Sequence, residues 1–362
     1  MAGVAQAAPP VPSGPVVVVS GLNNPRQLSL VSGIELLVAE AGKGGSFELP
    51  GGGPEGPVFI GTTGSISAVF FPQFVHNTSP HRIVTGLLSG AAEDGSGATG
   101  SDGVSATRLS GPIYIQQTWF PPNLLPDTLP KDQLGQLLRA RPFGPAKPFA
   151  DITAFEARHD PDGKGFDSNP YAVLVVGDHL LVADAAANDV LRVDQRGHVS
   201  LFHVFPNVTT GACANQFDPA PPFRGCNFVP TSLATDRWGN VYVGGLSSLT
   251  PGEAQVVKLD PSGRHVLRVW TGFTAVTGVA VGWDGTLYVS QLFAPQAHPI
   301  NPMVQGVLTK IRNGHRTNTD VPFPAGIALD RHGNLFVSAF SIAPDTGLGV
   351  PNTSGQVWRL RS

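Results

Sequence analysis

Acidic residues gather in one short stretch, EARHDPDGKGFD, which begins at Glu156. Within it Asp160, Asp162 and Asp167 are separated by two glycines. Ca²⁺ takes several carboxylate and carbonyl oxygens around a tight turn, so these three aspartates are candidate Ca²⁺ ligands. The spacing is not that of an EF-hand, and an ordinary Asx/Gly turn cluster is the competing interpretation.

A second group of candidates occupies the last position of a repeated strand motif, where a V-A, I-Q, V-G or V-S pair comes just before it. The members of this group are Glu40, Gln117, Asp184, Gly245, Gln291 and Ala339. Only the first and third repeats carry an acid there. Packing alone would favour equal residues at equal positions, so this asymmetry indicates a site.

Further polar residues should enter the same end of the molecule: Arg26, Asn169, Thr231 and Asn188. Together with the acids they form a candidate ligand or cation site, in which Glu40, Glu156 and Asp184 are the candidate catalytic residues. The structural interpretation pairs Arg26 with Glu40 or Asp184 and uses the acids to cap loop amides. Both interpretations stay open, since buried ion pairs also serve structure.

Most histidines map to turns at the opposite end of the predicted fold. Only His159 and His298 map to the end that carries the candidate site, and His298 is retained as a ligand-binding candidate. A surface histidine is usually only solvated. The chain contains no HExxH, GxSxG or GK[ST] motif, and we therefore expect no nucleotide or organic cofactor.

Internal repeats must position these residues. Four segments align closely, NPYAVLVVGDHLLVADAA, PTSLATDRWGNVYVGGLS, VTGVAVGWDGTLYVSQLF and PAGIALDRHGNLFVSAFS, and two weaker ones precede them. Each is an alternating strand, a turn that contains glycine, and a second strand, and further strands follow most of them. Six such units predict an all-β fold, a six-bladed β-propeller with four antiparallel strands per blade.

The ends of the chain predict how the ring closes. The last repeat ends with QVWRL and lacks a fourth strand, whereas the opening VVVVSGL matches the fourth strand of other units. We therefore expect the N-terminal strand to join the last blade. The long connections, between the second and third strands and between blades, should meet at one face near the central channel. Such a face usually binds the ligand.

Composition limits the classes of function. Gly and Pro number 44 and 34, a share that opposes long helices. The net charge is −3 and no basic run occurs, so nucleic acid is not an expected partner. No apolar stretch reaches the roughly 18 residues that span a bilayer. We expect a monomer, a single propeller over residues 15–362, that binds a small-molecule or polymeric ligand.

The N-terminus and the cysteines indicate export. Residues 1–14 read as the remnant of a signal peptide or a disordered tail, because AQA resembles the A-x-A end of such a signal. Cys213 and Cys226 lie thirteen positions apart in a proline-rich loop. In an exported protein they should form a disulfide, and we expect a secreted, periplasmic or extracellular location.

Several motifs together resemble the ScyD/ScyE family of exported proteins: GLNNPRQL, LLVAEAGKGG, DITAFEARHDPDG, DSNPYAVL, LLVADAAANDVLRVD, VPTSLA and WTGFTAVTGVAVGWDGTLYV. The resemblance runs from about Gly21 to the last blade. It implies a six-bladed propeller outside the cytoplasm and no particular reaction. More distantly, lactonase-type propellers hold Ca²⁺ with a Glu, Asn and Asp set, which Glu40, Asn169 or Asn188, and Asp184 could mimic by analogy of fold.

Three hypotheses about function follow. The first is an exported propeller that binds a ligand on its long-loop face, as an accessory enzyme of secondary-metabolite or aromatic chemistry. The second is a Ca²⁺-dependent hydrolase or lactonase, in which Glu40 or Glu156 moves protons. The third is a non-catalytic interaction scaffold, which predicts a broad apolar patch in place of a polar pocket.

Overall fold

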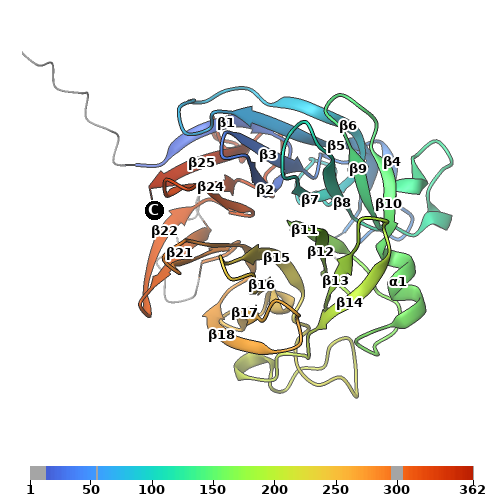
Figure 1. Ribbon diagram of the computed structural model, residues 1–362. Helices are drawn as coiled ribbons and strands as arrows, with labels where there is room; N and C mark the ends of the chain where they lie inside the picture. Colours follow the sequence, from blue (N-terminus) through green and yellow to red (C-terminus); the bar gives the residue numbers. More distant parts are fainter. Residues whose placement is uncertain (1–13, 54–55, 295–304, 362) are drawn as a thin grey trace, which may run out of the picture.

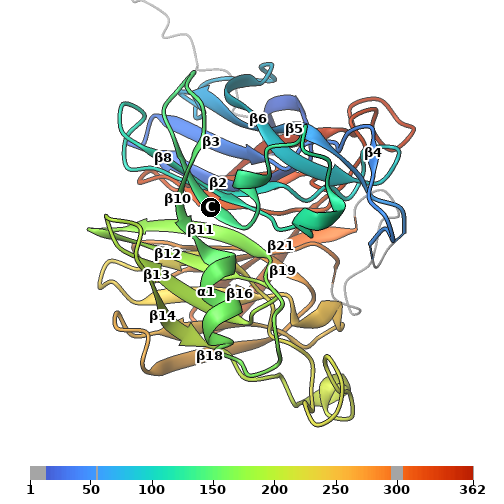
Figure 2. The same ribbon diagram turned by 90° about the vertical axis from the view of Figure 1, so that its right-hand side faces the viewer.

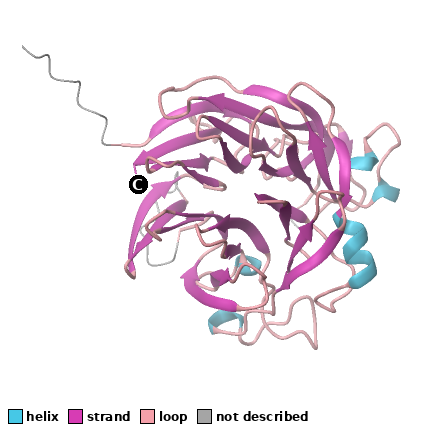
Figure 3. Ribbon diagram, in the orientation of Figure 1, coloured by secondary structure: helices cyan, strands magenta, loops and turns pink. Residues whose placement is uncertain are grey.

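The computed structural model describes residues 14–53, 56–294 and 305–361, and it confirms the six-bladed β-propeller. Six antiparallel sheets stand in a ring (Figure 1), and the helices among the described residues are short (Figure 3). Five sheets have four strands, and the first has a fifth, very short one. The predicted signal segment and His298 lie outside the described residues.

The first three blades follow one another along the chain. Blade one contains β2 (Pro25–Val31), β3 (Glu35–Glu40), β5 (Phe59–Phe70), β6 (His81–Ala91) and the short β4 (Phe47–Glu48). Blade two contains β7 (Ser101–Ser105), β8 (Ile113–Gln117), β9 (Gln136–Ala140) and β10 (Lys147–Asp151). Blade three contains β11 (Pro170–Val176), β12 (His179–Asp184), β13 (Asp189–Val193) and β14 (Val199–Val204).

The last three blades repeat this order, and the sixth also uses the first strand of the chain. Blade four contains β15 (Pro230–Thr235), β16 (Val241–Gly245), β17 (Ala254–Leu259) and β18 (Val266–Phe273). Blade five contains β19 (Val276–Val281), β20 (Leu287–Gln291), β21 (Gly306–Arg312) and β22 (His315–Val321). Blade six contains β23 (Ile327–Leu329), β24 (Asn334–Ala339), β25 (Gly355–Arg361) and β1 (Val16–Leu22).

The N-terminal strand closes the ring as predicted. β1 pairs antiparallel with β25, and Val18 and Val19 are fully buried. The other edge of β1 is also covered, because Asn77 N and Thr78 N donate to the carbonyls of Val17 and Val18 at 2.9 Å each. A covered edge cannot pair with another chain, so closure protects the sheet as well as the ring.

Helices are short. α1 (Ile152–His159) lies on the outside of the ring between blades two and three, where it packs near β9 and β14 (Figure 2). The 3₁₀ turns are η1 (Pro122–Leu124), η2 (Lys131–Gln133), η3 (Gly211–Cys213) and η4 (Ser247–Leu249). In the described part of the chain, no helix has the length and apolar character that crossing a bilayer requires.

The connections divide the molecule into two faces. The long-loop face carries connections such as residues 92–100, 118–135, 152–169, 205–229 and 340–354. The short-turn face carries the turns between first and second strands and between third and fourth strands, for example residues 177–178 and 282–286. The predicted disulfide joins Cys213 to Cys226 within the connection from blade three to blade four.

Candidate functional site

The repeat alignment is confirmed by strand register. In five blades the last residue of the second strand faces the first residue of the innermost strand, as in Pro25↔Glu40, Pro170↔Asp184 and Val276↔Gln291. In blade six Ala339 likewise ends the second strand, β24. Glu40, Asp184 and their counterparts therefore stand at the same level, at the long-loop end of each blade.

Glu40 is held by four different groups around its own blade. Its carboxylate accepts hydrogen bonds from Asn23 N at 2.8 Å, Ser67 Oγ at 2.6 Å and Ser65 Oγ at 3.1 Å. It also pairs with Arg82 at 2.7 Å and is fully buried. All its acceptor capacity is used, so Glu40 ties blade one together.

Asp184 and Gln291 likewise accept hydrogen bonds from the segments that enter the innermost strands of their blades. Asp184 accepts hydrogen bonds from Ser168 Oγ at 2.5 Å and Asn169 N at 2.7 Å, and Gln291 Oε1 accepts one from Thr274 N at 2.7 Å. Burial raises the pKa of Asp184 to about 6 in spite of these donors. Gln117 differs, because its side-chain amide donates to Leu88 O.

Arg26 pairs with neither of the two acids expected for it. Its guanidinium Nε lies 3.4 Å from Asp102 Oδ1, and both side chains are buried. The partner comes from the innermost strand of the next blade, β7, since blades meet along these strands at the axis. Burial raises the pKa of Asp102, although the Arg26 charge opposes this rise.

Asn169 joins a partly buried chain of hydroxyl groups. Its Oδ1 accepts from Thr118 Oγ1 at 2.8 Å, and Thr99 Oγ1 lies 3.1 Å from both Thr118 Oγ1 and Asp102 Oδ2. Thr231 Oγ1 donates to Val276 O at 2.6 Å. These polar residues thus bind neighbouring blades to one another.

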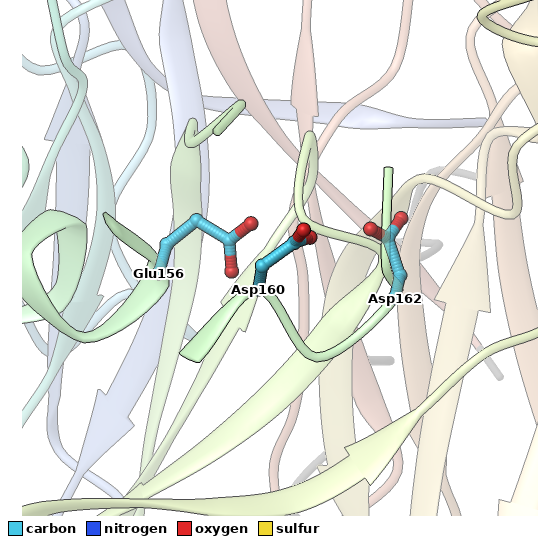
Figure 4. Close-up of side chains that lie close together, drawn as sticks. All are labelled: Glu156, Asp160 and Asp162. Carbon is cyan, nitrogen blue, oxygen red and sulfur yellow. The ribbon is translucent and has the colours of Figure 1, made fainter. Parts of the chain in front are cut away.

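The acidic stretch forms a different kind of group, which we call the acidic cluster: Glu156, Asp160 and Asp162. One carboxylate oxygen from each lies within 4.8 Å of the others, and Figure 4 shows Glu156 pointing toward Asp160, with Asp162 beyond it. Asp167, the other predicted ligand, lies outside this group of three and is exposed.

The caps of α1 and the turn that follows it orient the carboxylates of the acidic cluster. Asp151 caps the N-terminus of α1 by accepting a hydrogen bond from Ala154 N at 2.8 Å, and Asp160 caps its C-terminus in a left-handed conformation with φ 40°. The loop then turns back, because Asp160 accepts hydrogen bonds from Lys164 N and Gly165 N, each at 3.1 Å. This turn is the Asx/Gly structure considered above, and it brings the loop carboxylates toward the buried face of α1.

Two carboxylates here have no hydrogen-bond donor in the described structure. Glu156 is 1% exposed and Asp189, the first residue of β13, is 0% exposed, yet none of their four oxygens accepts a bond from a described residue. Burial, followed by the negative charges of Asp184, Asp162, Asp160 and Asp167, raises the pKa of Glu156 to about 8. Burial likewise raises the pKa of Asp189 well above its ordinary value.

Positive charge near the cluster is small. Lys164 Nζ lies 3.1 Å from Asp162 Oδ2, and it also donates to the side-chain carbonyls of Asn207 and Asn227. Asn188 Nδ2 donates to the same Asp162 oxygen at 2.9 Å. One ammonium group cannot balance the carboxylates around it, so the cluster has the charge and the oxygen donors that a hard divalent cation needs.

A surface hollow of about 410 Å³ lies beside the cluster. Asp162, Lys164 and Arg224 line it, together with Pro161, Val204, Phe205, Pro206, Asn207 and Phe223. Asp162 therefore belongs both to the cluster and to a space that a ligand can enter. The central channel contains a separate hollow of about 250 Å³, which has no carboxylate in its lining.

The sequence analysis named Glu156, Asp160, Asp162 and Asp184, which lie near one another, but it did not name Asp189 or Lys164. Asp189 faces Asp184 across β12 and β13. Like charges opposite each other in a sheet are unfavourable. Two acids that bracket a single turn, in DAAAND, were the signal that could have revealed this pair.

Comparison with known proteins gives the fold alone. No family model and no curated protein matches the chain. Solved structures similar to it include a streptogramin B lyase (10% identity, TM-score 0.49, 96% of each chain), a putative glucose dehydrogenase of Thermus thermophilus (17%, 0.49, 96% of this chain and 99% of that one) and a putative gluconolactonase (12%, 0.45, 96% and 92%). At these values the likeness concerns the propeller fold only.

Proposed function

We propose that this chain is an exported, Ca²⁺-binding β-propeller whose long-loop face binds a small-molecule or polymeric ligand beside the cation. The observation that carries the proposal is the acidic cluster, in which the buried Glu156 carboxylate has no donor among the described residues. A buried ionised carboxylate is costly unless it is paired or coordinates a metal. A cation between Glu156, Asp160 and Asp162 supplies the missing charge.

The donor set favours Ca²⁺ over other ions. All three groups of the cluster are carboxylates, whereas Zn²⁺ sites use cysteine and histidine. Mg²⁺ demands a near-ideal octahedron and retains several waters, while Ca²⁺ accepts a flexible shell of six to eight oxygens. Carboxylates on a helix and on an irregular loop suit the flexible shell better.

The ligand should be one that carries oxygen atoms with negative charge or a polarised carbonyl group. Asp162 would share the cation with such a group in the adjoining hollow, and Lys164 and Arg224 line the same space. A ligand of this kind satisfies the two cationic side chains and completes the coordination shell. Export is supported by the disulfide, since such bonds persist in oxidising compartments.

The hydrolase hypothesis receives less support from the same geometry. All the acceptor capacity of Glu40 is used within blade one, and Glu156 is too deeply buried to reach a substrate. A general base must lie within hydrogen-bond reach of the proton that it removes. Binding, with the cation as an organising element, accounts for the buried acids without a catalytic role.

Calorimetric titration of the chelator-treated protein with CaCl₂ tests the proposal. The full chain should bind one ion, and Asp160→Asn and Asp162→Asn should weaken binding at least tenfold. Asp127→Asn is the matched control, because this aspartate is exposed and pairs only with Lys131 four residues along. Absence of calcium binding by the wild-type protein would refute the cation site, as would equal binding by all variants.

A further inference from the structure

Two exposed phenylalanines occupy unusual backbone positions on the short-turn face. Phe71 follows β5 in blade one and Phe143 follows β9 in blade two, with φ values of 52° and 61°. Glycine or asparagine takes the corresponding left-handed positions in blades three, four and five: Gly197, Gly263, Asn313 and Gly314. A bulky residue at positive φ is unfavourable for folding, and burial in the core does not offset this cost here as it does at Phe323 and Phe340.

Two neighbouring turns and the strands beside them carry a group of aromatic rings, which we call the aromatic patch: Phe70, Phe71, Phe74, His81 and Phe143. The His81 ring lies 6.3 Å from Phe70 and 5.6 Å from Phe143, which joins blade one to blade two. Phe74 and Phe143 are each 74% exposed and Phe71 is 52% exposed. Apolar rings at this level of exposure, side by side, indicate an interaction surface.

Basic side chains adjoin the patch. Arg139, Arg141 and Lys147 line a hollow of about 530 Å³ in the hairpin that carries Phe143. All three are exposed, and none forms a side-chain ion pair with a residue of the described chain. Arg359 of blade six donates to Pro72 O at 3.3 Å, at the base of the Phe71 turn.

Acidic residues are absent from the turns that carry this patch. Residues 32–34, 71–80, 106–112 and 141–146 contain no Asp or Glu. The short turns of blades three, four and six each contain an aspartate, and so does one of blade five: Asp178, Asp194, Asp236, Asp260, Asp284 and Asp330. The short turns of blades one and two thus lack acids, whereas those of blades three to six carry both signs of charge, as in Asp194 with Arg196 and Asp236 with Arg237.

We propose that the aromatic patch and its basic rim dock this propeller onto the surface of an anionic phospholipid bilayer. Protruding phenylalanines insert at the boundary between headgroups and acyl chains, and the unpaired cations attract anionic headgroups. A second copy of the chain fits this surface less well, since a two-fold interface would place the basic rims against each other. Docking would leave the long-loop face, with its cation site, turned away from the bilayer.

Co-sedimentation of the full chain with vesicles tests the docking. Vesicles of phosphatidylcholine with 30% phosphatidylglycerol should bind the protein at low salt, and pure phosphatidylcholine vesicles should bind it much less. Arg141→Ser and Lys147→Ser should each lower the partition coefficient about fivefold, which is the factor that corresponds to about 1 kcal/mol per basic residue. Phe143→Ser should lower it about tenfold.

Matched controls come from outside the patch. Arg196→Ser alters an exposed arginine of blade three on the same face, and Phe217→Ser alters an exposed phenylalanine of the disulfide loop. Neither should change vesicle binding, and all variants should keep the wild-type melting temperature because the side chains are exposed. Asp160→Asn should bind vesicles normally, which separates this proposal from the cation site.

Three results would overturn the docking proposal. One is equal binding to neutral and anionic vesicles. Another is equal binding by the patch variants and their controls. The third is failure to bind any vesicles. This result would overturn the proposal even if the protein bound an acidic polysaccharide such as alginate or formed dimers in light scattering.

Discussion

Replacing Glu156 by glutamine should make the cation-free protein more stable and the cation-bound protein less so. Burial and the neighbouring carboxylates raise the pKa of Glu156 from 4.5 to about 8. The folded state therefore holds a proton that the unfolded state releases, and stability falls as the pH rises from about 4.5 to about 8. At pH 7 the loss is about 3 kcal/mol, because each pH unit above the unfolded value contributes about 1.36 kcal/mol.

Glutamine has the same shape and no charge, so Glu156→Gln removes this loss. With EDTA at pH 7 the variant should unfold at a temperature about 4 °C higher than the wild type. This shift follows from about 3 kcal/mol and an unfolding entropy of about 2.1 cal/mol/K per residue over 362 residues. At pH 4 the two proteins should melt together, because Glu156 is then protonated in both folded and unfolded chains.

Calcium should reverse the order of the two melting temperatures. At a thousandfold excess over Kd, a ligand that binds only the folded state stabilises it by about 4.1 kcal/mol, which exceeds the loss of about 3 kcal/mol. The wild type should gain this stability, while Glu156→Gln, which lacks one carboxylate ligand, should gain little. Scanning calorimetry with EDTA and with CaCl₂ measures both effects, and Glu93→Gln is the control at an exposed position of the same face. A variant that is less stable than the wild type in EDTA at pH 7, or an equal response to calcium, would refute the reasoning.

The other predictions concern the frame of the propeller. Cys213→Ser combined with Cys226→Ser should lower the free energy of unfolding by about 3 kcal/mol in denaturant titrations under oxidising conditions, and equal stability of the two proteins would contradict it. Deleting β1 should lower the free energy of unfolding by at least about 4 kcal/mol, since the deletion exposes the surfaces that Val18 and Val19 cover and reopens the ring. If denaturant titration showed a change in only a minor unfolding transition, this would argue against closure of the ring by β1. Glu40→Gln should lower the free energy of unfolding by about 2 kcal/mol, because it leaves the partly exposed Arg82 without its carboxylate partner. The control Asp345→Asn, in an ion pair at the surface, should change that free energy by less than about 0.5 kcal/mol.

The fold was predictable because its signals are local. Each hairpin carries its alternation and its turn glycine within about twenty residues, and the unpaired strand at each end of the chain indicated closure. The same locality made Glu40, Asp184 and Gln291 align correctly, since strand ends are set by the hairpin. The disulfide followed from composition and spacing.

Partners in space were not predictable from these signals. Arg26 pairs with Asp102, which is 76 positions further along the chain, and Glu40 pairs with Arg82, which lies in the outermost strand of its blade. Such contacts depend on the register between strands and on how blades meet at the axis. The number of donors available to a buried carboxylate depends on the same geometry, so the sequence placed Glu156 near the cation loop without revealing that its oxygens lack partners.

Both proposed sites contain arrangements that local rules disfavour. Asp184 opposite Asp189 in blade three, and Phe71 and Phe143 at positive φ in blades one and two, are each unfavourable by local rules. Natural sequences are generally consistent across local propensity, pairing and packing, and they break these rules where a functional demand outweighs the cost. In a repeat protein such departures can be recognised, because the equivalent positions in the other blades carry residues that local rules favour. In this propeller the two arrangements lie on opposite faces. The paired acids of the long-loop face favour a cation, and the exposed phenylalanines of the short-turn face, with basic residues beside them, favour an anionic surface.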